Sequence, residues 1–359
     1  MRNLNNKQSR EDSRIYFLDY LRVFAFVSVL IAHRYYEQLA LFANNMDVHI
    51  TLRLMVSMLS PFIEFGGAGV IVFFFISGYI ITCVAMREDF NAFIVRRFFR
   101  IYPLYIVAVI IEMMLNHIFK GEPIPSLSII LPRIALLGDF WGTPYSLNNV
   151  EWTLRIEIYF YIVIALMLKL GLFGYTKVLP IVYVLIIVLI QYLEPFPLVY
   201  GWSNGYASMF LPFLFVGSCV YLWEKGLSNK YIIFALSVYV WLSYLITMPS
   251  INNRLQNTHF LTVAIIIFLI CWAFRKNFKN ITWLVFLSEL TYSIYIFHNW
   301  MMQYFMDFGG FMGLSILQSN IFSLCSLLAF CSIFHFCVEK KFINIGARIT
   351  MKIKGDIEK

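Results

Sequence analysis

Three ionisable residues lie within the first long apolar stretch of this 359-residue sequence, which runs from about 15 to 41. They are Asp19, Arg22 and His33. Arg22 and His33 are separated by 11 positions, which at about 100° and 1.5 Å per residue places them on one helix face, roughly 16 Å apart. Asp19 precedes Arg22 by one turn and can pair with it. A neutral histidine can take a proton from a reacting group or carry a group covalently, and an arginine can stabilise negative charge.

Each of these residues also has a purely structural interpretation. Asp19 and Arg22 could form an ion pair at the edge of a membrane span, and His33 could be a core histidine hydrogen-bonded to a neighbouring helix. Ionisable groups inside apolar spans are costly, however, and by default they indicate function. The shared face of Arg22 and His33 favours the functional interpretation.

A compact arginine cluster, Arg96, Arg97 and Arg100, follows the second apolar stretch. If a helix begins there, the i, i+3 and i, i+4 spacings give it one cationic edge. The guanidinium group is suited to bidentate contact with phosphate. The alternative is a topological anchor that contacts lipid head groups.

Two further apolar stretches contain polar residues with regular spacing. Glu157 lies a turn or more inside a stretch that begins near Trp152, where it could act in catalysis or form a salt bridge with Arg155 or with another helix. Tyr295 and His298 follow Tyr292 at steps of three, so the three share one helical stripe. Ordinary packing or an interfacial aromatic belt would explain the tyrosines, whereas a histidine in mid-span favours function.

The composition requires a membrane to position these residues. Hydrophobic residues make up 60% of the chain, charged residues only 13%, and the mean hydropathy is +0.74. Ordinary globular domains are about 45–50% apolar and about 25% charged. We therefore predict an all-α fold, a polytopic bundle of transmembrane helices, because long uninterrupted apolar runs are not typical of a membrane barrel.

About ten stretches approach the length of some 20 residues that a span requires. They are 15–41, 60–86, 101–119, 152–170, 178–194, 206–223, 231–248, 259–274, 283–305 and 314–338. With the N-terminus in the cytoplasm, the inside segments contain 21 Lys and Arg residues and the outside segments 4. This asymmetry predicts that both termini are cytoplasmic. The predicted organisation is a cytoplasmic tail (1–14), a ten-span domain (15–338) and a basic cytoplasmic tail (339–359).

The net charge of +8 is accordingly a topology signal, and we expect no nucleic acid partner. We predict a multi-pass protein of the cell (inner) membrane. The histidines and cysteines show no metal-ligand spacing, so no metal site and no permanently bound cofactor are expected.

The sequence resembles the acyltransferase-3 family of integral membrane acyltransferases in six segments, which follow one another in the family's order over about 320 residues. These are Arg22-x10-His33 within an L-D-x-L-R opening; Phe73 to Tyr79, similar to F-F-F-x-S-G-F/Y; Arg97-x-x-Arg100; Trp152-Thr153-Leu154 with Glu157 and Phe160-Tyr161; Ser293-x-Tyr295 with His298; and Val338 to Phe342, similar to E-R/K-P-F but with Lys341 where proline is usual.

The resemblance implies that the protein moves an acyl group, most often acetyl, from cytoplasmic acyl-CoA (acetyl-CoA) to a hydroxyl of a surface glycan or lipid-linked sugar. Under this hypothesis His33, Arg22 and Glu157 are catalytic. Arg96, Arg97 and Arg100 bind the acyl-CoA, and the remaining motif residues support the site; these are Asp19, Trp152, Tyr295 and His298. His33 is then either the general base or a transient acyl carrier.

Many relatives in this family have an additional extracytoplasmic hydrolase-like domain, whereas this chain ends about 20 residues after its last predicted span. We therefore expect either direct transfer to the acceptor or a separate periplasmic partner protein. A transporter or flippase of a lipid-linked glycan is the alternative function. Transporters usually show internal repeats with helices broken at matching positions, and this sequence shows neither.

Overall fold

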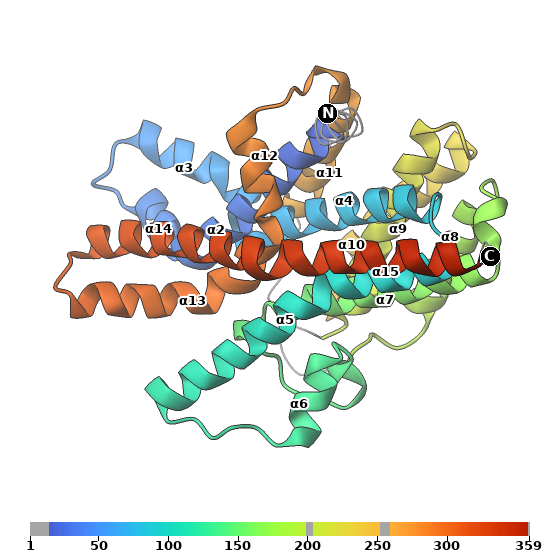
Figure 1. Cartoon of the computed structure of the whole chain (residues 1–359). Helices are drawn as coiled ribbons and strands as arrows, with labels where there is room; N and C mark the ends of the chain where they lie inside the picture. Colours follow the sequence, from blue (N-terminus) through green and yellow to red (C-terminus); the bar gives the residue numbers. More distant parts are fainter. Residues whose placement is uncertain (1–13, 199–203, 252–258, 358–359) are drawn as a thin grey trace. The chain divides into compact units, whose positions relative to one another are not determined.

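The computed structural model describes residues 14–198, 204–251 and 259–357, and the elements within them are helical. They fall into two compact units, one of residues 1–76 and 259–291, the other of residues 77–258 and 292–359. The first contains α2 (Tyr16–Asn44), α3 (Ile50–Ile63), α11 (His259–Ala273), α12 (Thr282–Glu289) and the start of α4 (Gly67–Ala85). The second contains the rest of α4 together with α5 (Phe90–Lys120), α6 (Leu127–Ile134), α7 (Glu151–Lys169), α8 (Leu179–Tyr192), α9 (Tyr206–Glu224), α10 (Lys230–Ile251), α13 (Thr291–Phe311), α14 (Ile316–Phe334) and α15 (Lys340–Ile357) (Figure 1).

Six helical segments of the described chain are long and apolar enough to cross a membrane, and two apolar helices, Leu179–Tyr192 and His259–Ala273, are shorter. The six are Tyr16–Asn44, Ile50–Ala85, Phe90–Lys120, Tyr206–Glu224, Lys230–Thr247 and Ile316–Ile353. The protein is therefore a polytopic helical membrane protein, as the composition predicts. Helices occupy all ten stretches expected from the sequence.

The structure corrects the sequence prediction at two places, and it adds a helix to the predicted C-terminal tail. The segment 42–59, expected as a loop, contains most of α3, and the stretch 283–305 is divided at Leu290 into α12 and α13. The predicted C-terminal tail forms α15, while the predicted N-terminal tail lies outside the described residues except for Arg14.

In the first unit, the buried residues of α2 lie in its first half, between Phe17 and Leu30, and this half packs closely against the start of α4. A β-carbon added at Gly69 would lie 2.5 Å from the carbonyl oxygen of Ala25, so only glycine permits this approach. Close contact between small residues is the usual way in which membrane helices pack. It fixes the position of the α2 segment that contains Arg22.

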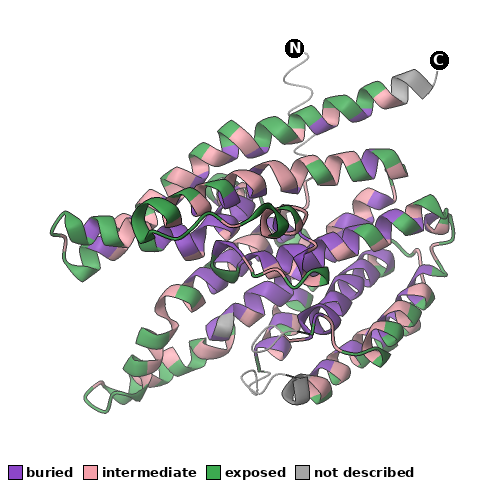
Figure 2. Ribbon diagram, turned by 90° about the horizontal axis from the view of Figure 1, so that it is seen from below, coloured by how far each residue is buried: buried purple, intermediate pink, exposed green. Residues whose placement is uncertain are grey.

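In the second unit, α9 is buried from Tyr206 to Leu222, and α4 approaches it so closely that a side chain at Gly78 would collide with the carbonyl group of Leu214. The C-terminal helix α15 lies along α5 (Figure 1), where the rings of Phe99 and Phe342 stack 6.3 Å apart. Up to Ile353, α15 has mainly exposed and half-buried residues (Figure 2). The second unit thus combines a fully buried helix with a surface helix that packs against α5.

Candidate functional site

A single uninterrupted helix, α2, positions Asp19, Arg22 and His33 in the first unit. Because no kink divides α2, the predicted geometry holds: Arg22 and His33 share a face and are roughly 16 Å apart along the axis. The side chain of Arg22 is half-buried. That of His33 is exposed. An exposed imidazole is accessible to a substrate.

The carboxylate of Asp19 is the centre of a buried polar cluster. It accepts hydrogen bonds from Arg14 at 2.7 and 3.1 Å, from Arg22 at 3.3 Å and from the hydroxyl of Ser288 at 2.6 Å. Arg14 also forms an ion pair of 2.8 Å with Glu289. The hydrogen bond with Asp19 raises the pKa of Arg14, so that its charge persists. The predicted Asp19–Arg22 pair is confirmed, and a buried carboxylate that is paired in this way fixes the orientation of Arg22.

In the second unit the arginine cluster lies near the start of α5, and two of its members pair with carboxylates of the protein. Arg96 forms an ion pair of 2.5 Å with Glu88 and donates a hydrogen bond of 3.2 Å to Thr350 of α15. Arg100 pairs with Glu339 at 2.8 Å. Neither arginine is simply a cation facing lipid head groups.

Glu339 connects the arginine cluster to two other segments of the chain. It is almost completely buried, and besides Arg100 it contacts the hydroxyl of Ser293 and Nδ1 of His335, each at 2.9 Å. A single turn of π-helix, His335–Glu339, brings the side chains of His335 and Glu339 together. Such turns are frequent at functional sites. The sequence analysis did not single out Glu339 for this role, although its position in the closing E-R/K-P-F-like segment was a signal.

Arg97 differs from its two neighbours. Its guanidinium group lies 5.9 Å from the centre of the Phe93 ring, and its Nε is buried without a hydrogen-bond partner among the described residues. Arg97 forms no ion pair with any residue that the structure describes. Of the three arginines, Arg97 therefore has the charge that is least compensated by the protein.

Glu157 is buried in α7, and only one of its two carboxylate oxygens accepts hydrogen bonds from the described residues. Its Oε1 accepts hydrogen bonds from the hydroxyls of Tyr161 at 2.6 Å and Ser77 at 2.9 Å. Within the described residues, Oε2 makes no hydrogen bond. The salt bridge with Arg155 that the sequence allowed does not form. A carboxylate held at one oxygen only can accept a further hydrogen bond or a proton.

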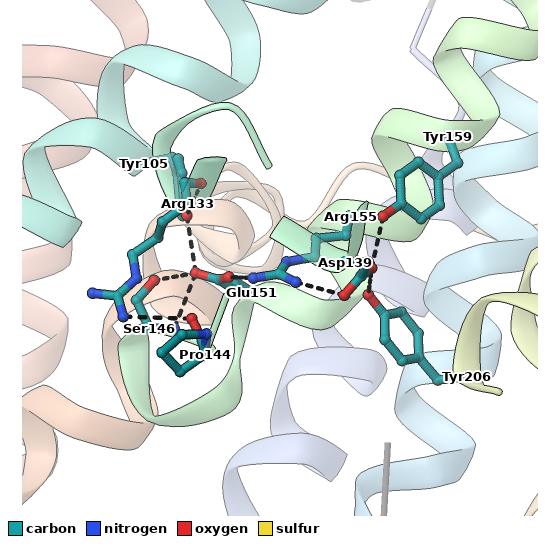
Figure 3. Close-up of polar contacts among 9 residues, drawn as sticks. All are labelled: Tyr105, Arg133, Asp139, Pro144, Ser146, Glu151, Arg155, Tyr159 and Tyr206. Atoms are coloured by element: carbon teal, nitrogen blue, oxygen red, sulfur yellow. Dashed lines mark hydrogen bonds and ion pairs between the residues drawn. The ribbon is translucent and has the colours of Figure 1, made fainter. Parts of the chain in front are cut away.

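Arg155 instead lies between two acidic residues, as Figure 3 shows. Its side chain is fully buried, forms an ion pair of 2.5 Å with Asp139 and a second ion pair with Glu151, and lies 4.6 Å from the centre of the Tyr145 ring. Hydroxyl groups satisfy the remaining carboxylate oxygens: those of Tyr159 and Tyr206 on Asp139, and those of Tyr105 and Ser146 on Glu151. This cluster joins the segment that precedes α7 to α5, α7 and α9.

The backbone just before α7 has an unusual conformation. Leu147, Asn148 and Asn149 all have positive φ angles of 49–68°, a region that residues other than glycine seldom adopt. The amide of Asn148 donates to Glu112 at 3.1 Å, and its carbonyl accepts from Asn299 at 2.8 Å. Contacts from α5 and α13 therefore hold this turn in place.

The predicted supporting residues of the second unit lie around the start of α7. Trp152 packs edge-on against Tyr206, with ring centres 5.5 Å apart. The hydroxyl of Tyr295 lies 2.5 Å from that of Thr153, and Nδ1 of His298 lies 2.7 Å from the carbonyl oxygen of Tyr295. The structure thus brings Trp152, Tyr295 and His298 to the α7–α13 region of one unit.

The side chains of the predicted site residues can transfer protons and bind anions. His33, Arg22 and Asp19 lie in the first unit, and the other predicted residues lie in the second. Across the described ranges, no three His, Cys, Asp or Glu side chains gather in a way that could hold a metal ion.

A family model described as an acyltransferase domain, that of the acyltransferase-3 family, matches residues 15–337. The chain is 29% identical over 177 residues to the "Putative peptidoglycan O-acetyltransferase YrhL" of Bacillus subtilis (strain 168), a match that covers 44% of this chain and 24% of that protein. The chain thus aligns with about a quarter of the length of that relative. No solved structure matches.

Proposed function

The chain belongs to the acyltransferase-3 family of membrane acyltransferases, and from this premise we propose that it is an O-acyltransferase of the cell (inner) membrane. It moves an acyl group, acetyl in the first instance, from cytoplasmic acyl-CoA to a hydroxyl of a surface glycan or lipid-linked sugar. The observation that carries the proposal is the family match over nearly the whole chain, which includes both Arg22 and His33. The distant relative with a peptidoglycan O-acetyltransferase name favours a glycan acceptor.

In the proposed reaction the acceptor hydroxyl oxygen attacks the thioester carbonyl carbon while a base takes its proton. The carbon–sulfur bond breaks, and the coenzyme A thiolate leaves and is protonated. His33 is the proposed base, or it accepts the acyl group itself before the acceptor does. Its exposed imidazole on α2 supports either role.

The arginines are proposed to hold the donor. Arg97 binds a phosphate of coenzyme A, because the protein supplies it with no carboxylate partner among the described residues. Arg96 and Arg100, although paired, add positive potential nearby. The 16 Å between Arg22 and His33 favours a donor-holding role for Arg22 over direct contact with the thioester oxygen.

Glu157 completes the set of proposed catalytic residues. Its free Oε2 supports hydrogen bonding to a substrate, and its hydrogen bonds from Tyr161 and Ser77 fix its position. We further propose ten spans with both termini in the cytoplasm, which places the start of α5 on the side where acyl-CoA is found.

Release of coenzyme A by the purified protein tests this proposal. The protein in detergent is mixed with radiolabelled acetyl-CoA and a glycan-containing envelope fraction, and both coenzyme A release and label in the glycan are measured. We expect equal amounts of the two, and neither when acetyl-CoA is omitted. A transporter of lipid-linked glycan would release no coenzyme A.

A further inference from the structure

A cavity of about 270 Å³ lies in the first unit between the second half of α2 and α3. Its walls include Tyr36, Ala40 and Asn44 from α2, and Ser57, Ser60 and Ile63 from α3. Ligand sites are typically about 300–1,000 Å³. The volume is therefore suited to one small group, such as a single sugar ring.

The cavity adjoins the face of α2 that carries His33. Tyr36 and Ala40 follow His33 by three and seven positions, which places all three residues on one side of the helix. The cavity begins about one turn beyond His33, in the direction opposite to Arg22. A ligand in it could thus reach the imidazole from the side that the donor does not occupy.

The polar groups of the cavity suit a neutral ligand rich in hydroxyls. No charged side chain lines it. Ser60 is half-buried, and its hydroxyl makes no hydrogen bond among the described residues. Asn44 donates through Nδ2 to the carbonyl of Ala40 at 2.9 Å, and its Oδ1 accepts no hydrogen bond from the described chain. One donor and one acceptor are available, as recognition of sugar hydroxyls requires.

The two walls are held together by specific contacts, so the cavity is preformed. Arg53 of α3 donates a hydrogen bond of 3.0 Å to the carbonyl of Ala43, at the end of α2. At the other end of α3, the hydroxyl of Ser28 donates to the carbonyl of Phe62 at 2.5 Å. A ligand would therefore meet fixed polar groups and would not have to order them.

From these observations we infer that the α2–α3 cavity is the acceptor subsite, which holds one neutral sugar residue with its hydroxyl within reach of His33. This inference rests on the proposed function. The acceptor enters beyond His33 and the donor on the Arg22 side, so the two substrates meet at the imidazole. Ser60 and Asn44 are specificity-determining residues for the sugar.

Two variants and two matched controls test the subsite in the full-length protein. Ala40→Leu fills the cavity, and Ser60→Ala removes the available hydroxyl. Ala273→Leu makes the same enlargement at an exposed position of α11, and Thr51→Val removes a hydroxyl from α3 outside the cavity. The acceptor is the envelope glycan fraction on which the wild-type protein shows transfer, and KM is measured for that glycan and for acetyl-CoA.

We expect a rise in the acceptor KM of roughly three- to tenfold for Ser60→Ala, the value of one neutral hydrogen bond, and a larger rise for Ala40→Leu. The KM for acetyl-CoA should stay within about twofold in both variants, and the controls should match the wild type. Unchanged acceptor KM values in both variants would overturn the inference. So would a changed preference between acetyl-CoA and butyryl-CoA at constant acceptor KM, since the cavity would then hold the acyl group.

Failure of the proposed function is a separate result. If the wild-type protein transfers no label from acetyl-CoA to any glycan of the envelope, the acyltransferase proposal itself falls, before any variant is compared. If Ala40→Leu does not fold, the acceptor KM of Ser60→Ala still tests the subsite, because loss of one half-buried hydroxyl leaves the packing almost unchanged.

Discussion

Two buried carboxylates, Asp19 and Glu339, each hold an arginine in a fixed orientation, one in each unit. Their exposed fractions are only 1%, and a carboxylate buried to this extent requires cationic and hydrogen-bonding partners. Arg22 and Arg100 are therefore part of the structure as well as candidates for substrate contact. Arg97, by contrast, has no carboxylate partner within the described residues.

Arg97 and Arg100 are accordingly predicted to differ when each is replaced by alanine. Arg97→Ala should raise the KM for acetyl-CoA at least about tenfold, the loss of one charged hydrogen bond, with little change in Tm. Arg97→Lys should restore it only in part, because lysine presents a point charge and not a fork. Steady-state kinetics and thermal unfolding in detergent measure the two effects.

Arg100→Ala leaves Glu339 buried without its cation, which typically costs about 3–5 kcal/mol. The main effect of this variant should therefore be a lower Tm, in contrast to the higher donor KM expected for Arg97→Ala. Glu339→Gln combined with Arg100→Ala should recover part of that loss. If Arg100→Ala retains the wild-type Tm, or if Arg97→Ala leaves the donor KM unchanged, the distinction between the two arginines is wrong.

At the scale of elements, one buried arginine, Arg155, pairs both with Asp139 of the segment that precedes α7 and with Glu151 at the start of α7. Arg155→Met would leave Asp139 and Glu151 as two buried and unpaired carboxylates. We expect destabilisation by about 3–5 kcal/mol, seen as a lower Tm and as faster proteolysis between residues 136 and 150. In the triple variant Arg155→Met, Asp139→Asn, Glu151→Gln, most of the stability should return. Wild-type stability of Arg155→Met with loss of activity would instead assign Arg155 to the reaction.

Sequence periodicity predicted the helices well and their interactions in part. The Asp19–Arg22 pair was predictable because both residues lie on one helix at a spacing of three. The partners of Arg155 were not, because Asp139 lies in an irregular segment whose path depends on tertiary contacts. Most of α3 was assigned to a loop. The segment 44–49, which is rich in polar residues, precedes it, and hydropathy alone does not show where a helix resumes.

The division at Leu290 is a further limit of hydropathy. The stretch 283–305 was predicted as one span although it contains Ser288 and Glu289. In the structure α12 ends at Glu289, and the amide of Leu290 donates hydrogen bonds to the carbonyls of Phe286 and Leu287. The exposure of His33 also depends on which neighbours pack against α2. A single sequence contains no information about those neighbours.

At the scale of the whole molecule, the distribution of basic residues complements the helix lengths. Six segments are long enough to cross a membrane, and α8 and α11 are shorter at 14 and 15 residues. α7 is 19 residues long but contains Glu151, Arg155 and Glu157. The ratio of 21 basic residues to 4 between the two sets of loops favours the proposed ten spans over six, and in that topology α7, α8, α11 and the α12–α13 stretch cross as well.

Cysteine labelling tests this topology. In a background without the six native cysteines, Asn91→Cys at the start of α5 should be labelled by an impermeant reagent only after the inner face is opened. Glu122→Cys, in the predicted outside segment, should be labelled in intact cells with a permeable envelope. Both side chains are exposed. The reverse pattern would place Arg97 away from acyl-CoA and contradict the proposed donor site.

The central claim, that the protein transfers an acyl group at His33, is tested most directly by the rate at which purified His33→Gln protein moves labelled acetyl from acetyl-CoA to envelope glycan. Glutamine retains a hydrogen-bonding group but can neither take the proton nor carry the acyl group. We predict a rate at least about 100-fold below that of the wild type, the usual contribution of a general base, with Tm and acetyl-CoA binding unchanged. A His33→Gln protein that retains half or more of the wild-type rate would contradict the account.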